Sequence, residues 1–262
     1  MYKRQIIFCG DRGSAEGLYG VTTHEIGHNW FPMIVNTDER RHAWMDEGFN
    51  SFMNIYSERE YFKRSDKPGD YGRAFARELR RETPPMDIPA DQYGPGLVGL
   101  MAYAKPATAL YQLRESVLGH ERFDAAFKEY IRRWAFKSPR PADFYRTMEN
   151  AAGVDLAWFW RGWFTESTTL DQTVEGVEQR SDNRTATISF GNLGEMVMPL
   201  TFEATLADGS KIRKKLPVEI WQWTNRWAAE IDTRGKKVVG VTVDPDEVLP
   251  DVNGSNNIWP AR

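Results

Sequence analysis

Residues 24–28 read His-Glu-Ile-Gly-His, and their types and spacing suit metal-assisted chemistry. If this segment is helical, His24 and His28 lie one turn apart on the same face, so both imidazoles can bind one ion. Glu25 then lies about 100° around the helix, where it can reach a water molecule beside the metal. The pattern therefore predicts a metal site with a neighbouring base, an arrangement suited to hydrolysis.

A catalytic zinc ion usually has three protein ligands and one open position. Glu47 follows His28 after eighteen residues. The polar segment 37–41 can turn the chain, and a second helix that starts near Asp46 would place Glu47 beside the first helix. Two histidines and one glutamate are a common ligand set for hydrolytic zinc. We therefore predict that His24, His28 and Glu47 bind one Zn²⁺ ion.

Composition excludes several other classes of protein. The only cysteine, Cys9, can form neither an internal disulfide nor a cysteine-based zinc site, and the chain has just four histidines. The net charge of −3, from 34 basic and 37 acidic residues, gives no basic surface for nucleic acid. No run of 18 apolar residues occurs, so no membrane span is expected.

The hydrophobic period changes near residue 170 and indicates an α+β chain. Before it, apolar residues recur at helical spacing, after a short apolar segment at 6–10 that suggests a buried strand. After it, apolar and polar residues alternate, which predicts about seven short strands in a small β-sandwich. We therefore expect a mostly helical domain at 1–169 and a β-sandwich domain at 170–262. The expected helices cover residues 21–30, 47–60, 107–118, 122–136, 142–151 and 156–164.

Three segments together resemble one family of enzymes. Residues 21–32 read Val-Thr-Thr-His-Glu-Ile-Gly-His-Asn-Trp-Phe-Pro, and residues 44–49 read Trp-Met-Asp-Glu-Gly-Phe. These segments and the spacing between them resemble the membrane alanyl aminopeptidase family of gluzincin zinc metallopeptidases. Residues 103–107, Tyr-Ala-Lys-Pro-Ala, look like that family's Tyr-x-Lys-Gly-Ala segment, with Pro106 in place of glycine.

The resemblance implies a fold and a role for each matching residue. It implies a thermolysin-like zinc catalytic domain followed by the family's β-sandwich, acting on peptides with a free N-terminus. His24, His28 and Glu47 would bind Zn²⁺. Glu25 would be the general base and would pass its proton to the leaving amine. Tyr103 would donate its hydroxyl to the oxyanion of the tetrahedral intermediate.

The sequence also departs from the family. A Gly-x-Met-Glu-Asn-like segment, whose glutamate binds the substrate's α-amino group, is expected just upstream of residues 6–10, and the chain contains none. The family's N-terminal domain is expected to be missing as well, so the chain is interpreted as truncated. Two alternatives to an aminopeptidase therefore stay open: a zinc endopeptidase, and a zinc-binding fragment without turnover.

Compartment and assembly are weakly indicated. The resemblance slightly favours an extracytoplasmic location, periplasmic or secreted, whereas a single free cysteine also fits the cytoplasm. The sequence predicts no particular oligomeric state and no preferred first residue of the substrate. Pro106 is expected to restrict the backbone after Tyr103.

Residues near the predicted ligands also have simpler interpretations. Asp46 is expected to cap the second helix. Ser51 and Asn54 share a helix face with Glu47, so either could support a metal ligand, although packing or solvent contact is favoured. His42 and His120 are expected at the surface.

Overall fold

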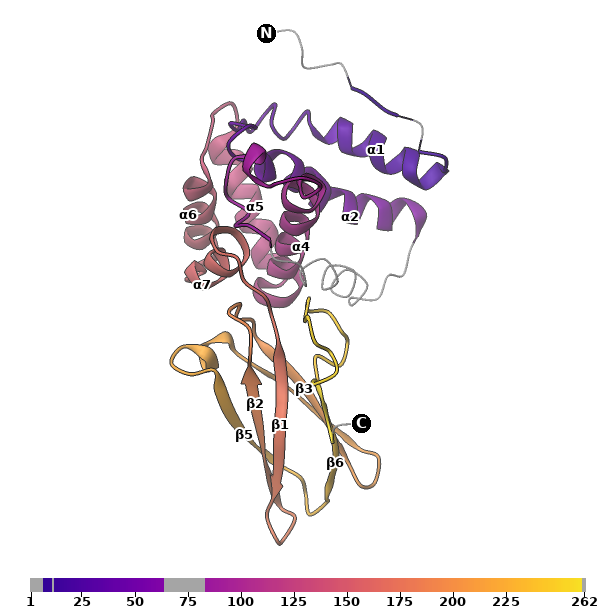
Figure 1. Cartoon of the computed structure of the whole chain (residues 1–262), viewed down its shortest axis with the longest axis vertical. Helices are drawn as coiled ribbons and strands as arrows, with labels where there is room; N and C mark the ends of the chain where they lie inside the picture. The colour runs from indigo at the N-terminus through magenta and orange to yellow at the C-terminus, as the bar shows by residue number, and fades with distance from the viewer. Residues whose placement is uncertain (1–6, 11, 64–82, 261–262) are drawn as a thin grey trace. The chain divides into compact units, whose positions relative to one another are not determined.

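The computed structural model describes residues 7–10, 12–63 and 83–260 of the chain. It confirms the α+β class: the α-helices precede Glu166, and strands follow from Gln172 with a short 3₁₀ helix, η6 (Val218–Trp221), among them (Figure 1). Contacts divide the described residues into a helical unit that ends at Ser167 and a β unit that starts at Thr168. None of the helices in the described ranges is long and apolar enough to cross a membrane.

The helical unit combines α-helices with wider π-helical turns that extend them without a break, and it has a separate 3₁₀ turn at Ala90–Gln92. Ser14 caps the first helix, because its Oγ accepts a hydrogen bond from the backbone nitrogen of Gly17 over 3.0 Å. Gly153, at φ +66°, ends α6 as predicted. The elements are α1 (Ala15–Gly27), η1 (Trp44–Gly48), α2 (Phe49–Phe62), η2 (Ala90–Gln92), η3 (Gly99–Ala104), α4 (Lys105–Gln112), η4 (Leu113–Leu118), α5 (His120–Trp134), α6 (Pro141–Ala152), α7 (Ala157–Trp160) and η5 (Arg161–Thr165).

Aromatic side chains form the core of this unit. Trp44 contacts Phe164 with ring centroids 4.7 Å apart, and Phe49 contacts Phe144 at 5.1 Å. Edge and tilted contacts of this kind add to the free energy gained by burying the rings. The helical stripe predicted for α5 is confirmed. Its buried members are Phe123, Ala126, Phe127 and Tyr130.

Helix α1 differs from the others because none of its residues is fully buried. It lies along α2, with which it makes its main contacts (Figure 1). Its bounds also differ from the predicted helix at 21–30, because the Ser14 cap starts it earlier and the chain turns after Gly27. Because η1, which carries Glu47, continues directly into α2, this contact brings the segments of the predicted metal ligands near one another.

The β unit consists of two antiparallel sheets around one apolar core. The first sheet has the order β1-β2-β5, and the second has the order β4-β3-β6-β7. Phe190 of the first sheet meets Phe202 of the second with ring centroids 4.9 Å apart. The strands are β1 (Gln172–Gln179), β2 (Thr185–Asn192), β3 (Leu200–Leu206), β4 (Lys211–Leu216), β5 (Arg226–Asp232), β6 (Val238–Val243) and β7 (Ile258–Trp259).

The alternation predicted for the last long strand is wrong at Val239. Val241 and Val243 are buried, but Val239 is 46% exposed and Val238 takes its place in the core. The cause is a register shift where β3 pairs with β6 near Leu206. A bulge of this kind inserts one unpaired residue and moves the next side chain to the opposite face.

The strand predicted at 6–10 is also wrong for its described part. Residues 7–10 form no strand, and Ile7 and Phe8 are 42% and 82% exposed. A strand needs a neighbour for its backbone hydrogen bonds, and no described strand pairs with this segment. Residue 6 itself lies outside the described residues.

Candidate metal centre

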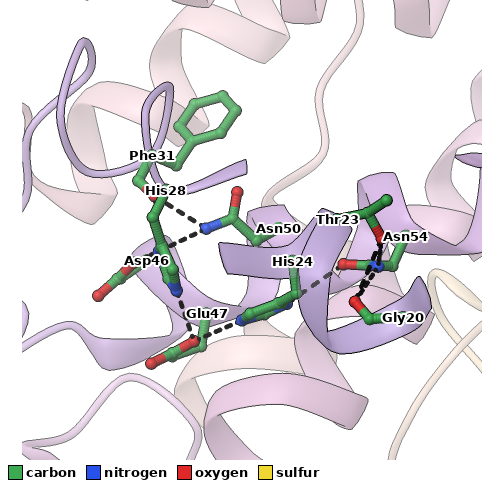
Figure 2. Close-up of polar contacts among 9 residues, drawn as sticks. All are labelled: Gly20, Thr23, His24, His28, Phe31, Asp46, Glu47, Asn50 and Asn54. Carbon is green, nitrogen blue, oxygen red and sulfur yellow. Dashed lines mark hydrogen bonds and ion pairs between the residues drawn. The ribbon is translucent and has the colours of Figure 1, made fainter. Parts of the chain in front are cut away.

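The structure brings the three predicted ligands together. His24 projects from α1, His28 is the C-cap residue that follows it, and Glu47 projects from η1 (Figure 2). Oε2 of Glu47 lies 2.9 Å from Nε2 of His24 and 3.5 Å from Nε2 of His28. One ligand atom of each residue lies within 4.8 Å of the ligand atoms of the other two residues.

This geometry fits a zinc ion. Tetrahedral coordination with bonds of about 2.1 Å separates neighbouring ligand atoms by roughly 3.4 Å. The distances of 2.9 and 3.5 Å from Oε2 of Glu47 to the Nε2 atoms of His24 and His28 lie close to that value. Two imidazole nitrogens and one carboxylate oxygen are also the donor set that zinc prefers. The residues present therefore suit the ion that the sequence predicts.

The imidazole of His24 is oriented by an amide. Nδ1 of His24 lies 3.2 Å from Oδ1 of Asn54. Nδ2 of Asn54 donates to the carbonyl oxygen of Gly20 over 3.0 Å and to Oγ1 of Thr23 over 2.9 Å (Figure 2). Because these two donations fix the amide, its oxygen must face the ring, so the ring proton belongs on Nδ1. Nε2 of His24 is then free to bind a metal.

The imidazole of His28 has a more crowded environment. Its Nδ1 lies 2.9 Å from the carbonyl oxygen of Phe31 and 2.8 Å from Oδ1 of Asp46. Nδ2 of Asn50 donates to the same Phe31 oxygen over 2.8 Å and lies 2.7 Å from Nδ1 of His28. With its proton on Nδ1, the ring has acceptors on that side and turns Nε2 toward Glu47.

The pKa values in this cluster reflect opposite charges held close together. Burial opposes protonation of His28, but contacts with Asp46 and Glu47 outweigh it and raise the pKa of His28 to about 11. Burial raises the pKa of Asp46 to about 6. Burial alone would raise the pKa of Glu47 too, but hydrogen bonds from both histidines and Tyr103 lower its pKa to about 2. A proton and a cation would therefore compete for Nε2 of His28.

The other two predicted site residues lie at the same centre. The ring of Tyr103, from η3, stacks on the ring of His24 with centroids 5.6 Å apart. Burial and the nearby charge of Glu47 raise the pKa of Tyr103 above its ordinary value. Glu25 is half-buried, and its charge also acts on the Tyr103 hydroxyl. Tyr103 therefore stays a protonated donor at neutral pH.

The structure revises the interpretation of three neighbouring residues. Asp46 does not cap α2: it lies within η1 and contacts His28 instead. Asn54 contacts His24, one of the predicted ligands, although packing or solvent contact was favoured for it. His42 is paired with Asp87, whereas His120 is exposed as expected. Asn54 lies seven residues after Glu47 on the same helix face, which was the signal that identified it as a candidate.

Comparisons with known proteins agree with this picture. A model of the peptidase family M1 domain matches residues 11–163, which include all five predicted site residues. Human endoplasmic reticulum aminopeptidase 1 is 27% identical over 162 residues, which cover 57% of this chain and 17% of that protein. Probable aminopeptidase 1 of Saccharolobus solfataricus is 25% identical over 210 residues, or 76% of this chain and 27% of that protein.

A solved structure supports the fold. The crystal structure of Legionella pneumophila aminopeptidase A in complex with aspartic acid matches 90% of this chain with a TM-score of 0.68 and 18% identity. The match covers 26% of that protein, and the chain spans about a quarter or less of its relatives' length. The family model covers more than half of the chain, including the metal centre. The chain therefore belongs to peptidase family M1.

Proposed function

We propose that this chain carries the catalytic centre of a zinc-dependent aminopeptidase. The observation that carries the proposal is the convergence of His24, His28 and Glu47, with Glu25 and Tyr103 beside them. When bound, the zinc ion would polarise the scissile carbonyl and lower the pKa of a coordinated water. The remaining chemistry belongs to the side chains of this chain.

Glu25 is the general base in this proposal. It follows His24 on α1 but points about 100° away from the ligand direction, so it does not compete for the metal. An ionised carboxylate there takes a proton from the attacking water and returns it to the leaving amine. General acid–base catalysis of this kind typically contributes about 10²- to 10⁴-fold to the rate.

Tyr103 stabilises the oxyanion in this proposal. Its phenol stays protonated because burial and the charge of Glu47 raise its pKa. Stacking on His24 holds the ring at the metal centre. A single donor to an oxyanion typically contributes about 3–4 kcal/mol to transition-state binding.

Removal of one amino-terminal residue at a time is supported by the names of the relatives, which are aminopeptidases. A test compares a peptide that has a free amine with its N-acetylated twin, using the zinc-loaded chain. We expect hydrolysis of the free peptide alone. Equal hydrolysis of both would favour an endopeptidase, and bound zinc without turnover would favour a binding fragment.

The role of Glu25 is tested by Glu25→Gln, which keeps the size of the side chain and removes its basicity. We expect at least about 100-fold slower hydrolysis with zinc still bound. Glu16→Gln, at an exposed position on the same helix, is the matched control and should hydrolyse peptide as wild type does. Wild-type rates in Glu25→Gln would refute the mechanism.

A further inference from the structure

Asp46 is a buried acid that the catalytic scheme does not use. The residue is 7% exposed and precedes the ligand Glu47 in η1. Its Oδ1 lies 2.8 Å from Nδ1 of His28, the nitrogen that faces away from Glu47 (Figure 2). Among the described residues, no hydrogen-bond donor is aligned with this oxygen. The contact with His28 is therefore an ion-pair approach and not a straight hydrogen bond.

The two histidine ligands are supported in different ways. His24 has the neutral amide of Asn54 behind it. His28 already has an aligned acceptor for its Nδ1 proton, the carbonyl oxygen of Phe31 at 2.9 Å. Asp46 is thus not needed to accept that hydrogen bond. What it adds behind His28 is a negative charge.

Charge balance gives that negative charge a purpose. Two neutral imidazoles and the Glu47 carboxylate leave a divalent cation with a net charge of +1. A buried net charge is costly unless an opposite charge lies close by. The Asp46 carboxylate places one such opposite charge directly behind the ring of His28. A carboxylate behind a ligating histidine also makes the ring a stronger donor.

We propose that Asp46 is a positioning residue of the metal centre, whose buried charge strengthens zinc binding through His28. This inference rests on the proposed zinc site. The same carboxylate would keep the ring of His28 from turning its Nε2 away from the ion. Zinc affinity, and not only the stability of the fold, should then depend on Asp46.

The experiment measures the zinc dissociation constant of the full chain by competition with a chromophoric chelator. Asp46→Asn keeps the size and removes the charge, and Asp46→Ala removes both. We expect both variants to bind zinc about 10- to 100-fold more weakly than wild type. At one fixed zinc concentration, zinc should also raise the Tm of both variants less than it raises the Tm of wild type.

Asp87→Asn is the matched control. Asp87 is also a half-buried acid paired with a histidine, with Oδ1 3.0 Å from Nδ1 of His42, and it is not part of the metal centre. The zinc dissociation constant of the Asp87→Asn variant should equal that of wild type. Wild-type affinity in folded Asp46→Asn would overturn the inference, as would an equal loss in Asp87→Asn. Failure of the wild-type chain to bind zinc would instead overturn the proposed function.

Discussion

At Gly27 the backbone of α1 lies close to a side chain behind the predicted ligand His28. A Cβ atom at this position would lie 2.7 Å from Oδ1 of Asn50. Asn50 is buried and also contacts Nδ1 of His28. The glycine within the sequence His-Glu-Ile-Gly-His therefore has a packing role, because it lets this amide reach the second ligand.

Gly27→Ala should consequently damage both fold and site. The added methyl group must displace Asn50, and overpacking of this kind typically costs about 1–3 kcal/mol in the free energy of unfolding. We expect a lower urea midpoint and weaker zinc binding. Gly99→Ala is the control, since nothing lies within 4 Å of a Cβ there. Equal stability of the two variants would contradict this interpretation.

At this scale the sequence predicts the cluster of candidate ligands but not all of the residues that contact them. His24 and His28 were predictable because helical spacing alone places them on one face. Asp46 was misinterpreted because an acid before a helix is typical of a cap, and its contact with His28 depends on how two distant segments fold together. Asn54 was correctly placed on the face of Glu47, but only the structure shows the donors that fix its amide.

At the scale of elements, η1 and α4 approach each other closely beside the ligand Glu47. A Cβ on Gly48 would lie 2.6 Å from both Cβ and Cγ of Pro106. Pro106 lies in the first turn of α4, where a proline is well tolerated. Its ring occupies the space beside Gly48, so the departure from the family's glycine is accommodated by close packing against η1.

Gly48→Ala should destabilise the chain, and Pro106→Gly should relieve the clash. We expect the single variant Gly48→Ala to lose about 1–3 kcal/mol of unfolding free energy. The double variant should lose less than the sum of the two single variants, because the residues are in direct contact. Strict additivity in a double-mutant cycle, measured by urea unfolding, would show that the two elements do not clash.

A second contact between elements joins η4 to α5. Arg114 donates from Nε and Nη2 to the two carboxylate oxygens of Asp124, over 2.7 and 2.9 Å, and from Nη1 to Glu115 over 2.8 Å. The hydrogen bond from Arg114 lowers the pKa of Asp124. Burial alone would raise the pKa of Glu115. Hydrogen bonds from His120, Tyr56 and Arg114 outweigh this effect and lower the pKa of Glu115.

Acid should therefore weaken this contact. A lowered carboxyl pKa contributes stability above the unfolded-state value of about 4, and that stability is lost as the pH falls through the folded-state pKa. We expect the urea midpoint of wild type to fall more steeply below about pH 4 than that of Arg114→Met. Arg146→Met, at an exposed position on α6, should follow the wild-type slope. Parallel curves for wild type and Arg114→Met would refute the prediction.

Elements themselves were predictable where their hydrophobic pattern was regular. The stripe on α5 and the alternation in β2 and β3 are confirmed. The pattern failed at Val239, where a bulge changes the register, and at residues 7–10, where apolar residues lack a strand partner. Both failures depend on pairing between segments, which a one-dimensional pattern does not contain.

At the scale of the whole molecule, the metal centre lies entirely within the helical unit. All of its ligands and supports come from residues before Ser167. The family match ends at residue 163, and the β unit begins shortly afterwards. The proposed activity therefore depends on one local arrangement in the helical unit, the convergence of His24, His28 and Glu47.

The most direct test is a crystal of the zinc-soaked chain measured at the zinc absorption edge. We expect one dominant anomalous peak about 2.0–2.2 Å from Nε2 of His24, Nε2 of His28 and a carboxylate oxygen of Glu47. The peak should disappear in Glu47→Gln crystals soaked at limiting zinc. An anomalous peak elsewhere, with none among these three atoms, would contradict the account.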